Sequence, residues 1–433
     1  MMMGEKQMQV IENSKIKEKL YLEKLENGLT VMIIPKKGME KKYMIWGTNY
    51  GSNENVFIVP GENTKTEVPN GVAHFLEHKL FEQENGTNSL DTLTALGVDA
   101  NAFTTNDITA YLFGCTDNFY PAMDELMDYV QNPYFTDENV EKEKGIIGQE
   151  IMMYDDSPDW KVYLNAMQIL YHNHPIKIDV VGTIDSISKI DKEILYKCYD
   201  TFYNLSNMAI VVCGDFEPEN MLEEIKKRLK DSNSKVNGEI QTFYPEEPDT
   251  IVKEKIEQKM EVSRPMYTIA IKVKPIDNPE EMVKRDIAIQ ILLELLIGKS
   301  SKLYKQLYDE GIISGGIGAN YEFSENYAHV LISGQSNEPE QVYRRIKEEI
   351  NRQKQEGISE NDFNRIKKKV YGEYVKDYDD VENIANMFLT NYFMGINSFD
   401  YLNQIDTIDV EYLTQVLNDV FKEEKMVISI VKN

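Results

Sequence analysis

IIGQEIMMYDD at residues 146–156 and VYGEYVKDYDD at residues 370–380 are two copies of one motif. A Gly, a Tyr and an Asp-Asp pair recur in both, and residue 370 stands 224 positions after residue 146. Because the chain has 433 residues, this offset is close to half its length. Similarity at such an offset indicates an internal duplication of a whole domain.

A second correspondence supports the duplication. SKIDKEILYKCYDTFYNLSNMAIVVCG, from Ser188, resembles DTIDVEYLTQVLNDVFKEEKMVISIVK, from Asp406, and each stretch has the pattern of a helix followed by a closing strand. Residues 230–250, between the copies, are rich in Asn, Ser, Pro and charge, which is typical of a linker. The sequence therefore predicts two homologous domains, at 1–232 and 250–433, with a linker at 233–249.

The order of elements in the first half predicts the fold class. Strand patterns occur at 29–35 (LTVMIIP), at 43–51 and within 101–113, whereas 72–83 and 137–154 have helical spacing. Pairs of strands with helices gathered elsewhere favour an α+β fold over a βαβ alternation. We therefore expect each domain to be a mostly antiparallel sheet packed with helices.

Charge and composition exclude several classes of partner. Lys and Arg total 47 against 73 Asp and Glu, so the formal net charge is -26, which disfavours nucleic acid and anionic membrane surfaces. The apolar stretches are shorter than the roughly 18 to 20 residues that a membrane span needs, and the N-terminal residues lack the apolar core of a secretory signal. Cys115, Cys198 and Cys213 are an odd number without CxxC spacing, which favours reduced thiols and a cytoplasmic location.

The pentapeptide His74-Phe75-Leu76-Glu77-His78 has the chemistry of a metal site. Residues four apart share one face of a helix, so His74 and His78 can offer two imidazoles to one metal ion, with Glu77 beside them. Only 5 of the 433 residues are His, and chance would produce this spacing in about 0.6% of such chains. The alternative is a pair of histidines and a glutamate on a solvated helix face.

A catalytic zinc ion normally has three protein ligands, and the sequence offers a third. Glu143 and Glu150 stand seven apart in VEKEKGIIGQEIMMY, which puts both carboxylates on one helical face two turns apart. Glu150 could therefore complete the site. In a chain with 73 acidic residues, an ordinary charged helix face is the alternative for this pair.

Taken together, these motifs resemble the pitrilysin/insulinase family of zinc peptidases, whose inverzincin motif is His-x-x-Glu-His. The resemblance implies that one Zn²⁺ per chain is bound by His74, His78 and Glu150. It also implies that Glu77 is the general base and that Glu143 is a further catalytic acid behind the ligands. It extends over the full chain, because the family has two similar halves that form a clam-shell, of which only the first binds metal.

Two further segments fit this resemblance. The family has an Asn-Ala-x-Thr segment on an edge strand beside the zinc, which implies substrate contacts for Asn101, Ala102, Phe103 and Thr104. In the second half, IGKSSKLY from Ile297 aligns with HFLEHKLF from His74, and it has serines at the positions of Glu77 and His78. The second half therefore lacks the metal ligands.

The same resemblance implies a function and a partner. The expected activity is that of a zinc endopeptidase, or processing peptidase, that hydrolyses extended or unfolded peptides. The tract at 141–160 is most similar to the metal-bearing member of bacterial paired peptidases linked to elongation factor P modification or peptide maturation. An Arg and a Tyr that anchor substrate in the family are missing from 298–316, where Tyr308 and Ile313 or Ser314 stand. A heterodimer with a related subunit that lacks the zinc motif is therefore expected, with a homodimer as the alternative.

Two other functions share these residues. One is a non-catalytic scaffold with a peptidase fold that recruits a modification or maturation partner, and the other is a metal hydrolase of non-peptide amides. The remaining histidines point to neither: His172 and His174 are expected on the surface of a Pro-flanked loop, and His329 is expected within a strand.

Overall fold

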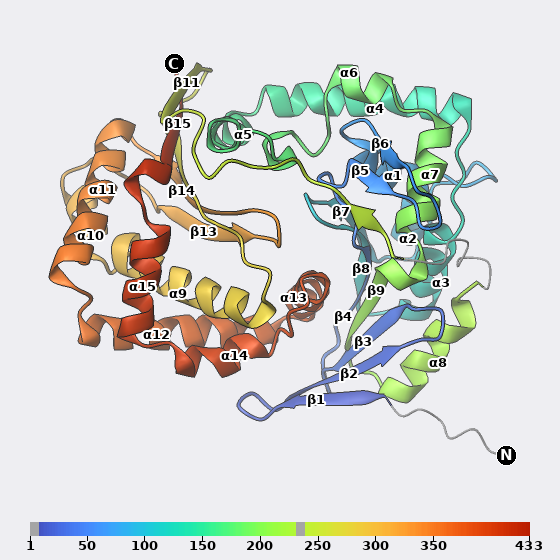
Figure 1. Ribbon diagram of the computed structural model, residues 1–433. Helices are drawn as coiled ribbons and strands as arrows, with labels where there is room; N and C mark the ends of the chain where they lie inside the picture. The colour runs from blue at the N-terminus through green and yellow to red at the C-terminus, as the bar shows by residue number, and fades with distance from the viewer. Residues whose placement is uncertain (1–7, 231–238) are drawn as a thin grey trace. The chain divides into compact units, whose positions relative to one another are not determined.

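The computed structural model describes residues 8–230 and 239–433, and these divide into two compact units (Figure 1). Each unit combines helices with a mostly antiparallel sheet, so the α+β class expected from the sequence is confirmed. Within the described ranges, no helix is both long and apolar enough to cross a membrane. Unit 1 comprises the described residues up to Ile151, those of Asp179–Phe243, and Asp377–Phe393; unit 2 comprises Met152–Ile178, Tyr244–Lys376 and Met394–Asn433.

A seven-stranded sheet organises unit 1. Its strands are β1 (Gln9–Asn13), β2 (Glu18–Lys24), β3 (Thr30–Pro35), β4 (Lys42–Thr48), β7 (Asp99–Thr104), β8 (Thr109–Cys115) and β9 (Met208–Gly214). Their order is β1-β2-β3-β9-β4-β8-β7, in which only β3 and β9 pair in parallel. Every residue of β9 is buried, as expected for an apolar strand in the middle of a sheet, whereas β7 is an edge strand. A smaller sheet joins β5 (Val56–Ile58), β6 (Lys65–Glu67) and β10 (Gln241–Thr242).

A five-stranded sheet organises unit 2. Its strands are β11 (Lys255–Lys259), β12 (Met266–Lys272), β13 (Gly318–Phe323), β14 (Ala328–Gln335) and β15 (Met426–Lys432), in the order β11-β15-β12-β14-β13. The first pair is parallel and the others are antiparallel. This pattern repeats the β3-β9-β4-β8-β7 part of unit 1 strand by strand. The two sheets therefore share one topology, as a duplicated domain requires.

Helices surround each sheet. Unit 1 has α1 (Val72–Leu80), α2 (Ser89–Ala95), α3 (Phe119–Val130), most of α4 (Asp137–Asp155), α6 (Ile184–Ser188), α7 (Lys192–Phe202), α8 (Pro218–Arg228) and α13 (Val381–Phe393). Unit 2 has α5 (Pro158–Leu170), α9 (Pro279–Ile297), α10 (Lys302–Asp309), α11 (Pro339–Glu356), α12 (Glu360–Lys376), α14 (Asp400–Gln404) and α15 (Val410–Val420).

Each copy of the duplicated motif lies at a place where the chain passes from one unit to the other. After α4 the chain enters unit 2, where α5 packs on β12 and β15 and buries Met167 and Leu170. After α12 it enters unit 1, where α13 packs on β4 and β9, with Leu389 directly over Gly47. The compact units therefore differ from two uninterrupted domains at 1–232 and 250–433. The reason is that α5 and α13 each bury their apolar face against the sheet of the other sequence half.

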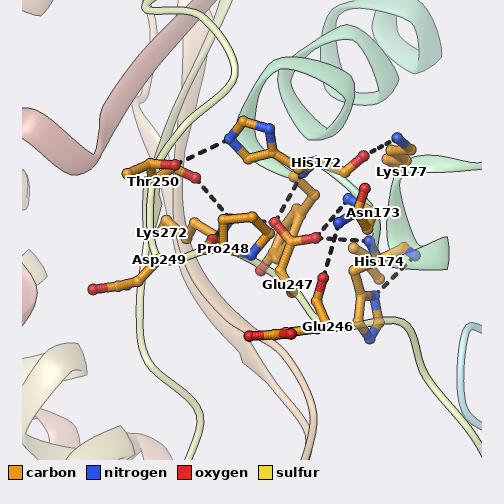
Figure 2. A network of polar contacts seen from close by, with 12 residues as sticks. His172, Asn173, His174, Lys177, Glu246, Glu247, Pro248, Asp249, Thr250 and Lys272 are labelled. Atoms are coloured by element: carbon orange, nitrogen blue, oxygen red, sulfur yellow. Dashed lines mark hydrogen bonds and ion pairs between the residues drawn. The ribbon is translucent and has the colours of Figure 1, made fainter.

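Part of the predicted linker is firmly anchored. Residues 231–238 lie outside the described ranges, but Glu247 accepts hydrogen bonds from the backbone N–H groups of His172, Asn173 and His174 at 2.6–2.8 Å (Figure 2). Its carboxylate also pairs with the buried Lys272 of β12. These donors overcome the effect of burial and hold the pKa of Glu247 at about 2. Glu247 therefore ties the segment that follows α5 to the sheet of unit 2.

Glu247→Gln is expected to lower the free energy of unfolding by about 2 kcal/mol at pH 7, because hydrogen bonds to a charged group are lost. The folded-state pKa lies below the ordinary value, so this contribution is present above roughly pH 5 and disappears as the pH falls toward about 2. Denaturant unfolding of both proteins at several pH values measures it, with Glu246→Gln as the neighbouring control. An equal difference at pH 7 and pH 3 would show that the charge of Glu247 does not stabilise the fold.

Candidate metal centre

The helix α1 presents the pentapeptide at the side of the unit 1 sheet. It packs against β7, β8 and α7, and it buries His74 and Glu77. It starts directly after Gly71, whose φ of 92° is left-handed. A Cβ at Gly71 would lie 2.7 Å from the carbonyl oxygen of Val181, so both the backbone conformation and the close approach require glycine here.

The structure brings His74, His78 and Glu150 together. The Nε2 atom of His74 is 3.7 Å from one carboxylate oxygen of Glu150, and the Nε2 atom of His78 is 3.5 Å from the other. One ligand atom from each residue lies within 4.8 Å of those of the other two. In a tetrahedral zinc site with ligand distances of about 2.1 Å, two ligand atoms are about 3.4 Å apart. The spacing therefore fits zinc, with His74 and His78 on α1 and Glu150 on α4.

The protonation of His74 also suits a ligand. Burial, reinforced by the neighbouring His78, lowers the pKa of His74 to about 3. The ring is therefore neutral at pH 7, which is the form that coordinates metal ions. Two nitrogen ligands and one carboxylate oxygen form a donor set typical of catalytic zinc.

Behind the ligands, Glu143 orients His78. The Nδ1 atom of His78 is 3.1 Å from Glu143 Oε1, and Lys79 Nζ is 3.5 Å from Glu143 Oε2. Burial raises the pKa of Glu143, but the contacts with His78 and Lys79 outweigh it and leave that pKa below its ordinary value. Lys79 is fully buried (0% exposed) and also pairs with Glu82. The Nδ1 atom of His74, by contrast, is buried without a partner among the described residues.

Glu143→Gln is expected to weaken zinc binding or turnover by about 10- to 100-fold, the usual cost of losing a group that orients a metal ligand. The amide cannot carry the negative charge that faces His78 and Lys79. Zinc titration with a competing chelator and a rate assay measure the two effects, and Glu141→Gln on the same helix is the control. Unchanged zinc affinity together with unchanged turnover would remove Glu143 from the site.

Glu77 lies beside these groups, but its carboxylate is bound by Thr104 of β7. Its side chain is buried (8% exposed), and Thr104 Oγ1 donates a hydrogen bond of 2.6 Å to Glu77 Oε2. Burial raises the pKa of Glu77, and the bond from Thr104 opposes only part of this shift. A carboxylate whose proton affinity is raised in this way is suited to accept a proton.

The four residues predicted to bind substrate fall on two faces of β7. Thr104 faces α1, and side chains alternate along a strand, so Ala102 shares its face. Asn101 and Phe103 line a pocket on the opposite face. The structure thus gives Thr104 a contact with Glu77 that the sequence did not reveal.

The other histidines form no metal cluster among the described residues. The expectation that His174 is a surface residue is wrong, because it is 1% exposed and stacks on Tyr244. Its Nδ1 accepts the N–H of Ile176 and its Nε2 contacts Asn326, so both ring nitrogens are used. His172 is half-buried, and His329 lies in β14 as expected.

The second half lacks more than the ligands. Ser300 and Ser301, which align with Glu77 and His78, lie between α9 and α10 instead of within one helix. Ser301 caps α10 by accepting the N–H of Tyr304. Residues four apart in this segment therefore do not share a helical face.

Comparisons with known proteins show the family to which the chain belongs. Residues 49–184 match the family model described as insulinase (peptidase family M16), and residues 189–370 match the one described as peptidase M16 inactive domain. The chain is 37% identical to a Bacillus subtilis protein named uncharacterized zinc protease YmfH, over 96% of this chain and 97% of that one. It is 22% identical to zinc protease PqqE of Helicobacter pylori, over 92% and 89% of the two chains. The crystal structure of an M16-like peptidase from Alicyclobacillus acidocaldarius superposes with a TM-score of 0.92 at 33% identity, covering 98% of this chain and 99% of that one.

Proposed function

Because this chain belongs to the M16 (insulinase) peptidase family, we propose that it is a zinc-dependent endopeptidase that hydrolyses extended peptides. One observation carries the proposal: the ligand atoms of His74, His78 and Glu150 converge while Glu77, beside them, remains outside the ligand set. A binding scaffold has no physical need for a separate buried base next to three convergent ligands.

In this mechanism each side chain has a distinct task. His74, His78 and Glu150 would hold zinc, and bound zinc would supply a Lewis acid that polarises a carbonyl and acidifies water. Glu143 keeps His78 oriented through Nδ1. Glu77 takes a proton from the attacking water and passes it to the leaving amine, and Thr104 holds the Glu77 carboxylate in place for both transfers.

The substrate preference follows from the sheet. β7 is an edge strand whose last residue, Thr104, contacts the base. An extended peptide can add to such an edge through main-chain hydrogen bonds. Folded proteins cannot present a free strand in this way, so unfolded chains and short peptides are the proposed substrates.

We also propose that full activity needs a second, related subunit that lacks the zinc motif. The residues at the expected Arg and Tyr positions are Tyr308, which is exposed on α10, and either the buried Ile313 or the exposed Ser314, so the expected Arg and Tyr are not present there. A partner subunit could supply these groups. The compartment proposed for the pair is the cytoplasm, which suits the three buried, free cysteines.

Assays of the zinc-loaded chain, alone and with the candidate partner, test both proposals. We expect slow cleavage of an unfolded peptide mixture by the chain alone and a gain of about 10- to 100-fold for each substrate hydrogen bond that the partner restores. Fast turnover by a verified monomer, without a gain on adding partners, would contradict the need for a second subunit. A protein that binds no zinc and cleaves no peptide in either state would contradict the peptidase function.

A further inference from the structure

A pocket of about 490 Å³ lies on the face of the unit 1 sheet that is opposite α1. Asp99, Asn101 and Phe103 of β7 form one wall. Tyr43 of β4 and Glu382 of α13 are also part of its lining. The zinc ligands and Glu77 are on the other face, so this pocket is distinct from the metal centre.

The pocket is next to the free edge of β7. When a peptide pairs with an edge strand, side chains directly opposite each other point to the same face of the sheet. Peptide residues opposite Asp99, Asn101 and Phe103 would therefore point toward the pocket, and those opposite Ala102 and Thr104 would point toward α1. Every second residue of a bound peptide can thus contact the pocket.

The charges of the pocket are not balanced. Lys41 Nζ is 3.1 Å from Glu382 and 3.7 Å from Asp380, so the one lysine in the pocket is already paired with two carboxylates. Asp99 is exposed and has no ion pair with any residue of the described ranges. The charged residues of the lining are one lysine, Lys41, and two carboxylates, Asp99 and Glu382, so the lining has a formal net charge of -1 that favours a cation.

The walls between these charges are apolar or neutral. Phe103 is half-buried and Leu112 also lines the pocket. Tyr43 belongs to the lining but is almost fully buried (2% exposed), and its OH accepts a hydrogen bond from Asn386. Burial raises the pKa of Tyr43, with Glu382 and Asp99 adding to the shift, so its phenol is neutral at pH 7. Long side chains with an aliphatic stem and a cationic head match such a surface.

We propose that this pocket selects peptides with a Lys or Arg side chain opposite Asp99 or Asn101 of β7. The proposal rests on the peptidase function and adds a substrate class to it. Asp99 contacts the cationic head, and Phe103 contacts the stem. The preference is confined to alternate positions of the peptide, because the intervening side chains point toward α1.

Binding to the zinc-loaded Glu77→Gln chain, with its partner subunit where needed, tests this without cleavage. Fluorescent extended peptides carry Lys, norleucine or Glu at one position at a time. We expect Lys to bind about five-fold more tightly than norleucine, and Glu more weakly, at one position or at two positions that are two residues apart. Asp99→Asn should remove the difference, and Asp99→Lys should transfer the preference to Glu. Asp91→Asn, at an exposed site on α2, is the matched control.

The outcomes separate the two proposals. One outcome is that the wild-type protein cleaves the peptides, that Lys and norleucine peptides bind with equal affinity, and that Asp99→Lys does not change this. That outcome would overturn the pocket assignment and leave the peptidase function intact. A preference at consecutive positions would also overturn it. A wild-type protein that neither binds nor cleaves any peptide would overturn the peptidase function and the pocket assignment with it.

Discussion

Glu77→Gln protein is expected to bind zinc with wild-type affinity and to lose peptide hydrolysis. The amide has nearly the same shape as the carboxylate, and its oxygen can still accept the 2.6 Å hydrogen bond from Thr104. It cannot accept a proton at neutral pH, so the transfer from water to the leaving amine stops. Loss of a general base costs about 10²- to 10⁴-fold in rate. Measurements of kcat/KM on a single peptide, alongside metal analysis of the same sample, give both results.

Two controls make this prediction specific. Glu84→Gln changes an exposed glutamate in the segment between α1 and α2 and should leave the rate unchanged. Thr104→Val should keep zinc and lower the rate less than Glu77→Gln, because the carboxylate remains but loses its hydrogen bond. A Glu77→Gln enzyme with near wild-type turnover would mean that another group is the base.

Much of the metal centre could be predicted because its geometry is local. His74 and His78 share one turn of α1, and α4 places Glu143 and Glu150 two turns apart on one face, as helical spacing requires. What joins these two helices is a tertiary contact. The spacing made Glu150 a possible third ligand, and the motif resemblance assigned it to the site.

The parts that could not be predicted depend on burial and register. Nothing in HFLEHKLF distinguishes the fully buried Lys79 from a solvated lysine, because a pairing with Glu82 is also possible on a solvated helix and its second partner, Glu143, is distant in sequence. An edge strand at residues 101–104 was expected, but which face of β7 meets α1 depends on packing, and this decides the role of Thr104. His174 was expected on the surface because its loop is flanked by proline. The loop is in fact held by Glu247, which lies in a segment with the composition of a linker, so this contact could not be expected from the sequence.

The sequence also did not predict that α5 and α13 each pack on the sheet of the other sequence half, although each of these helices follows a copy of the duplicated motif. Sequence similarity shows that two segments correspond, but it does not show which sheet each helix covers. Both sheets retain the same strand order, yet the second lacks a continuous helix at the position of the pentapeptide. The fold therefore depends on the buried strands and on α5 and α13, which pack on the sheets. The metal centre is found in only one of the two units.

This independence of fold and site leads to the second large effect, which is expected for His78→Ala. The substitution removes one of three ligands and also the partner of Glu143, leaving only His74 and Glu150. The loss of zinc affinity should therefore exceed the roughly 10- to 100-fold that is typical of changes behind the ligands. Because the His78 side chain is partly exposed, the protein should still fold. Zinc per chain after gel filtration, together with chelator competition and circular dichroism, measures both properties.

The matched control is His172→Ala, which removes a half-buried histidine whose ring is within hydrogen-bond distance of the hydroxyl of Thr250. It should keep one zinc per chain, since none of its atoms lies in the metal centre. Together the two variants separate loss of a specific ligand from a general effect of removing an imidazole. A folded His78→Ala protein that still holds a full equivalent of zinc would exclude His78 as a ligand. The third ligand would then have to come from another residue, and Glu77, whose pKa is raised in part by the charge of Glu150, is a candidate.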